Sequence, residues 1–203
     1  KGFYSTTVYA DALDAGADSI PDITNLVTVS SDTTVYAYRQ TITSSGGNLA
    51  FTDNAKLKVG DGENPAGVIM QNHSTAAMSI GGNGSLGFTG HSEGLIWFSN
   101  MKDGAGRSFN FNSPITGENG VTFASAWQYD GDNGRIPIVQ LAANTGIWKG
   151  DTHLRGVRLY VVSRTGLPED GDVYVHGSGY KHQAQIVLPS GTYTNHFHLS
   201  GNG

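Results

Sequence analysis

Histidines gather near the C-terminal end of the sequence, where His196-Phe197-His198 places two imidazoles two residues apart. Side chains two apart on a β-strand lie on the same face, so this pair can chelate a transition metal such as iron or zinc. His176 or His182, on a neighbouring strand, would complete the ligand set. The alternative is ordinary hydrogen bonding at the surface or between strands, because no Asp or Glu within ten residues of the pair can orient the rings.

A second candidate metal site is the acidic, glycine-bounded segment from residue 130 to 134. Asp130, Asp132 and Asn133 offer two carboxylates and an amide, which are the oxygen ligands that calcium prefers. The bidentate Glu that closes an EF-hand loop is missing. A plain Asx-type turn is therefore the alternative interpretation.

Aromatic residues beside polar ones favour saccharide binding. Trp127 and Tyr129 lead directly into Asp130, so two rings that can stack on sugar faces stand beside a carboxylate that can accept hydrogen bonds from hydroxyl groups. Trp148 is a further candidate platform. Trp97, inside Leu95-Ile96-Trp97-Phe98, is expected in the hydrophobic core instead.

The sequence offers no catalytic motif in the context that its chemistry needs. Gly90-His91-Ser92-Glu93-Gly94 matches Gly-x-Ser-x-Gly but leads into a predicted strand rather than a helix, and no glycine-rich phosphate loop precedes a helix. Glu93, Asp103, Glu118 and Asp130 are carboxylates that could pair for glycoside hydrolysis, but their spacing selects no pair. We therefore expect a binding or structural protein rather than an enzyme.

The elements that must position these residues are short β-strands. Runs of β-branched and aromatic residues alternate with glycine- and asparagine-rich turns, and helical periodicity is nearly absent. We expect an all-β fold, either a β-sandwich or irregular antiparallel β-structure, which an intertwined trimer could also form. Strands are predicted at residues 25–30, 34–43, 67–71, 94–98, 120–128, 136–141, 156–163, 172–176, 183–188 and 192–199.

Two regions differ in texture. Residues 1–150 are glycine-rich with few charges, whereas residues 151–203 predict a tidier β-meander; a single domain is the alternative. The sequence shows no repeat of constant period, which argues against a regular solenoid but leaves an irregular β-helix open.

Composition excludes several classes of function. The 203 residues include 12 Lys and Arg against 17 Asp and Glu, for a net charge of −5, which disfavours nucleic-acid binding. The chain has no cysteine, so disulfides and thiolate metal sites are excluded. No apolar run approaches the roughly 18 residues that span a membrane. Because the sequence begins at Lys1 rather than Met, we expect a processed chain or an excised fragment.

The His196/His198 pair, the texture rich in Gly, Asn, Ser and Thr, and the lack of cysteine resemble bacteriophage tail fibres and other virion surface proteins. That resemblance implies a homotrimer on the virion surface, iron held by His-x-His pairs, and contact with a host-surface glycan or protein. The alternative is a secreted carbohydrate-binding module or adhesin, and the third is a fragment of a polysaccharide-degrading enzyme.

Overall fold

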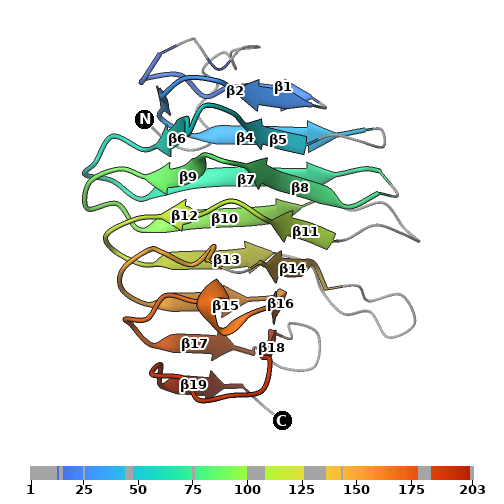
Figure 1. The fold of residues 1–203 in the computed structure, drawn as a ribbon, viewed down its shortest axis with the longest axis vertical. Helices are drawn as coiled ribbons and strands as arrows, with labels where there is room; N and C mark the ends of the chain where they lie inside the picture. Colours follow the sequence, from blue (N-terminus) through green and yellow to red (C-terminus); the bar gives the residue numbers. More distant parts are fainter. Residues whose placement is uncertain are drawn as a thin grey trace.

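The protein is a parallel β-solenoid in which short strands stack coil upon coil from β1 to β19 (Figure 1). The computed structural model describes residues 13, 16–24, 26–43, 48–74, 76–99, 108–125, 136–142, 144–177 and 184–201. The pairings between the described strands are parallel. The strands form three sheets, here called the long, middle and short sheets.

The long sheet has eight strands and runs the length of the solenoid. In order they are β1 (Asp22–Thr24), β4 (Tyr38–Ile42), β7 (Ala66–Asn72), β10 (Gly94–Ser99), β13 (Val121–Ser125), β15 (Thr152–Arg155), β17 (Val173–His176) and β19 (Phe197–Ser200).

The other two sheets form the remaining sides. The seven-stranded middle sheet consists of β2 (Val27–Val29), β5 (Asn48–Phe51), β8 (Met78–Gly82), β11 (Ser108–Phe111), β14 (Ile138–Leu141), β16 (Arg158–Val161) and β18 (Gln185–Val187). The four-stranded short sheet consists of β3 (Thr33–Val35), β6 (Lys56–Val59), β9 (Ser85–Phe88) and β12 (Ile115–Thr116). A 3-10 turn, η2, spans Arg164–Gly166.

The chain visits the sheets in a fixed order: long, middle, short, then long again, until β12. After β12 it alternates between the long and middle sheets only. Among the described residues that follow β12, loops replace strands on the third side, and an isolated bridge between Ile115 and Gly146 continues the short sheet. The change in residue composition near residue 150 coincides with this loss of the third strand. The long sheet continues past residue 150, because β13 pairs with β15.

The core follows from the alternation of side chains along each strand. In β10, Ile96 and Phe98 are fully buried and point inward, whereas Leu95 and Trp97 are half-buried on the outward face. The expectation that Trp97 lies in the core is therefore wrong: it is one position out of phase with the inward residues. Inward side chains stack in register between coils, as Val68, Ile96 and Phe123 do.

Aromatic rings fill the middle of the solenoid. Phe98 lies 4.6 Å from Phe109 between ring centroids, and Phe111 meets Phe123 edge-on at 6.2 Å. Trp148 meets Phe123 edge-on at 5.9 Å. Such pairs stabilise the core by about 0.5–1.5 kcal/mol beyond their burial.

The all-β prediction is confirmed, and each predicted strand range overlaps a strand. The β-sandwich, the antiparallel structure and the intertwined trimer fold are wrong, because a single chain completes a parallel solenoid. Glycine-rich turns between short strands are common to hairpins and to solenoid corners, so the turns alone did not distinguish the two. No α-helix occurs among the described residues, and no helix within them is long and apolar enough to cross a membrane.

Corners of consecutive coils pack in direct backbone contact. Gly82 has φ +112°, and a Cβ there would collide with the backbone of Phe51 in the previous coil. A Cβ at Gly84 would collide with the carbonyl group of Ala55. These glycines are required because nothing larger fits between the coils.

Candidate functional site

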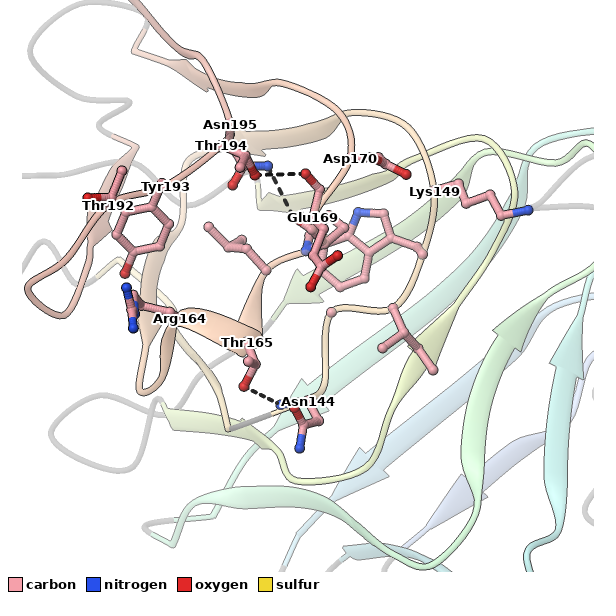
Figure 2. Close-up of a pocket in the computed structure, with 15 residues that line it drawn as sticks. Asn144, Lys149, Arg164, Thr165, Glu169, Asp170, Thr192, Tyr193, Thr194 and Asn195 are labelled. Carbon is pink, nitrogen blue, oxygen red and sulfur yellow. Dashed lines mark hydrogen bonds between the residues drawn. The ribbon is translucent and has the colours of Figure 1, made fainter.

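A groove of about 850 Å³ opens where the short sheet ends, on the third side of the solenoid (Figure 2). Three loops from successive coils build it. Its lining residues are Asn144, Gly146, Ile147, Trp148, Lys149, Arg164, Thr165, Leu167, Pro168, Glu169, Asp170, Thr192, Tyr193, Thr194 and Asn195.

The floor of the groove is apolar and rigid. Trp148 and Leu167 are 2% and 3% exposed, and Trp148 Nε1 donates a hydrogen bond to Thr152 Oγ1 at 3.2 Å. Ile147, beside them, is 53% exposed. An exposed isoleucine beside a buried apolar floor is a surface that a ligand would cover.

Hydrogen bonds between loops of successive coils hold the walls. Asn195 Nδ2 donates to the carbonyl oxygens of Pro168 and Gly171 at 3.1 and 2.9 Å. Thr194 Oγ1 donates to the carbonyl of Glu169 at 2.9 Å. The wall that carries Tyr193 is therefore tied to the wall that carries Glu169.

Charged side chains rim the groove. Lys149 Nζ lies 2.8 Å from Glu118 Oε2, and this hydrogen bond and charge raise the pKa of Lys149. Glu169, Asp170 and Arg164 are exposed. An apolar floor with a few charged and amide groups around it suits a polyhydroxylated ligand that has one apolar face.

A second polar cluster lies on the outward face of the long sheet. His153, Tyr174 and His198 occupy matching register positions on β15, β17 and β19. The Tyr174 ring stacks on His153 at 4.8 Å and on His198 at 4.4 Å between centroids. Because both faces of Tyr174 are covered, this column presents ring edges to solvent and does not offer a sugar-stacking platform.

The His196/His198 pair meets a carboxylate that the sequence did not place near it. Asp172 Oδ1 lies 3.1 Å from His196 Nδ1, and Asp172 Oδ2 lies 2.9 Å from His198 Nε2. The hydrogen bond from His198 is the main cause of a lowered pKa at Asp172. Asp172 is 24 residues before His196, and only the pairing of β17 with β19 brings them together.

These contacts favour hydrogen-bonded histidines over a metal site. His176 faces His153 rather than His196 and His198, and His182 lies outside the described residues. Within the described part of the chain, no group of three or more His, Asp or Glu side chains is arranged to hold a metal ion. Iron or zinc at His196 and His198 stays a prediction.

The predicted saccharide and calcium residues have different outcomes. Trp127, Tyr129, Asp130, Asp132 and Asn133 lie outside the described residues. Trp148 lies in the groove, but its burial and its edge-on contact with Phe123 contradict its use as an exposed stacking platform.

Three other acidic side chains have hydrogen-bond partners. Asp61 accepts hydrogen bonds from the backbone N–H groups of Glu63 and Asn64, which is an Asx-type turn. Glu93 accepts a hydrogen bond from Thr122, as Glu118 does from Lys149. These contacts give the acidic side chains structural roles.

The sequence did not predict Ile147, Tyr193 and Asn195 as site residues, and the groove brings them together with Arg164 and Glu169. They lie on three loops separated by one coil each. A contact between coils leaves no local pattern, so only the solenoid register could have grouped them.

Comparison with protein-family models, curated protein sequences and solved structures finds no match for this chain.

Proposed function

We propose that this chain is a structural, adhesive protein of a virion surface that binds a host-surface saccharide in the groove below β12. The groove is the observation that carries the proposal. Its volume of about 850 Å³ falls within the roughly 300–1,000 Å³ of ligand sites. Its floor is apolar, and carboxylates, a guanidinium and amides surround it.

The solenoid supplies what an adhesive protein needs, a rigid frame that fixes loops on its side. The groove loops are tied to each other by Asn195 and Thr194 and to the core by Trp148. A site that is already ordered loses little conformational entropy when it binds.

A glycan array tests this proposal, with wild-type protein beside Tyr193→Ala, Tyr193→Phe and Tyr160→Ala. Tyr193 lines the groove, whereas Tyr160 lies on the outward face of β16 and serves as the matched control. We expect wild type, Tyr193→Phe and Tyr160→Ala to bind the same saccharides and Tyr193→Ala to lose most binding. Saccharide binding that survives Tyr193→Ala unchanged, or an array without any bound saccharide, would contradict the proposal.

The working assembly that we propose is a homotrimer. The resemblance to tail fibres supports it, and three linked grooves would raise a weak single-site affinity through multivalency. Light scattering coupled to size exclusion should give three times the mass of the chain. A monomeric mass would refute the trimer but would not contradict saccharide binding in the groove.

A further inference from the structure

The two cationic side chains of the groove, Lys149 and Arg164, differ in their ion pairs. Lys149 is occupied by Glu118 at 2.8 Å, and the charge of Asp170 also acts on Lys149. Arg164 is exposed and, among the described residues, forms no ion pair with a carboxylate. One end of the groove therefore carries a guanidinium whose charge is available to a ligand.

The Arg164 side chain packs on the backbone of Gly191. A Cβ at Gly191 would lie 2.6 Å from Arg164 Cδ and 3.2 Å from Nε and Nη1, so the stem and one edge of the guanidinium rest on that glycine. Figure 2 shows Arg164 extending toward the Tyr193 ring, at the opposite end of the groove from Lys149. A guanidinium held by its stem loses less rotamer freedom on binding than a free surface arginine.

We propose that the groove selects acidic saccharides and that Arg164 binds their negatively charged group; this inference rests on the saccharide-binding function proposed above. The planar guanidinium offers paired N–H donors that match a carboxylate or a sulfate ester. A sugar ring linked to that group would then lie against Tyr193 and the apolar floor.

Glu169 and Asp170 set the orientation of the ligand. Both are exposed carboxylates on the groove wall, and they repel a second negative charge. They accept hydrogen bonds from sugar hydroxyl groups instead. The acidic group of the ligand is therefore directed to the Arg164 end and the neutral part to the Glu169 end.

The experiment compares saccharides in matched pairs on one array: sialyllactose with lactose, trigalacturonate with its carboxyl-reduced form, and a sulfated galactose disaccharide with the unsulfated one. Wild type should bind the acidic member of at least one pair about tenfold more tightly than its neutral partner. Tighter binding of the carboxylated or of the sulfated saccharides identifies which acidic group the guanidinium binds. Raised salt should weaken this binding.

Variants assign the preference to Arg164. Arg164→Gln should bring the acidic member to the affinity of the neutral one, and Arg164→Lys should retain part of the difference. Arg155→Gln, an exposed arginine on the outward face of β15, is the matched control and should change nothing. Unchanged thermal melts show that each variant is folded.

The outcomes separate the two proposals. Equal binding of both members of every pair, or a preference that persists in Arg164→Gln, overturns the acidic-ligand inference and leaves saccharide binding in place. Binding of no saccharide at all overturns both.

Discussion

His153 Nδ1 lies 3.1 Å from His176 Nε2, although 23 residues separate the two histidines in the sequence. Their ring centroids are 5.4 Å apart and the ring planes differ by 14°. These separations place the rings end to end in nearly one plane, so a single N–H···N hydrogen bond joins them. One nitrogen must donate and the other accept, which requires at least one neutral imidazole.

This pair predicts that acid weakens the fold. Burial, followed by the charges of Arg155 and His153, lowers the pKa of His176 from its ordinary 6.5. As pH falls below 6.5 the unfolded chain takes up this proton before the folded one, so the free energy of unfolding decreases. Thermal melts between pH 8 and about 5 should show a smaller decrease for His176→Gln than for wild type. The exposed His91 offers a control, and a His91→Gln variant that flattens the profile equally would refute the assignment.

The alternation of β-strand side chains predicts unequal costs for two leucine truncations. Leu154 is fully buried between Phe123 and Val175 in register, whereas Leu95 is half-buried on the outward face. Leu154→Ala should lower the free energy of unfolding by about 2–5 kcal/mol and Leu95→Ala by clearly less. Urea denaturation measures both. Equal losses would mean that the inward and outward faces of the long sheet are assigned wrongly.

Close packing of the coils predicts that a single methyl group at Gly84 disturbs the fold. A Cβ there collides with the Ala55 carbonyl, whereas a Cβ at Gly81 meets nothing nearer than 3.8 Å. Gly84→Ala should therefore destabilise by about 1–3 kcal/mol or more, and Gly81→Ala by much less. Differential scanning calorimetry distinguishes them. A Gly84→Ala protein whose melting temperature equals that of wild type would contradict the contact between coils.

The hydrogen bonds of the Asn195 amide join two walls of the groove, so we predict that Asn195→Ala destabilises the groove. Asn195 Nδ2 donates to two backbone carbonyls, and Asn195→Ala leaves both without that donor. We expect a loss of about 1–3 kcal/mol and weaker saccharide binding. Asn83→Ala is the control, because Asn83 is exposed, lies outside the groove lining, and its amide oxygen accepts a long bond of 3.4 Å from the Asn54 N–H group. Matching effects of the two variants would exclude a special role for the Asn195 amide.

Local sequence patterns predicted eleven of the nineteen described strands, because alternation and turn residues are local properties, but they missed β1, β5, β6, β8, β9, β11, β12 and β15. Val68, Ile96 and Phe123 each repeat the inward position, and the steps between them are 28 and 27 residues. The step from Tyr38 to Val68 is 30 and that from Leu154 to Val175 is 21. This varying coil length concealed the repeat, and with it the parallel pairing.

The groove could not be found in the same way. Tyr193, Arg164 and Trp148 meet only because their coils stack, and the loops between coils differ in length. Asp172 was likewise overlooked as a partner of His196 and His198, since proximity along the chain was the only criterion available. Pairing between coils decides such contacts, and it is a property of the whole fold.

Hydrogen–deuterium exchange with and without the saccharide that binds most tightly on the array locates the binding site directly. We expect slower exchange in the three groove loops, at residues 144–149, 164–170 and 192–195, and unchanged exchange at the backbone amides of β10. Slower exchange elsewhere, with the groove loops unaffected, would contradict the assignment of the groove as the saccharide site.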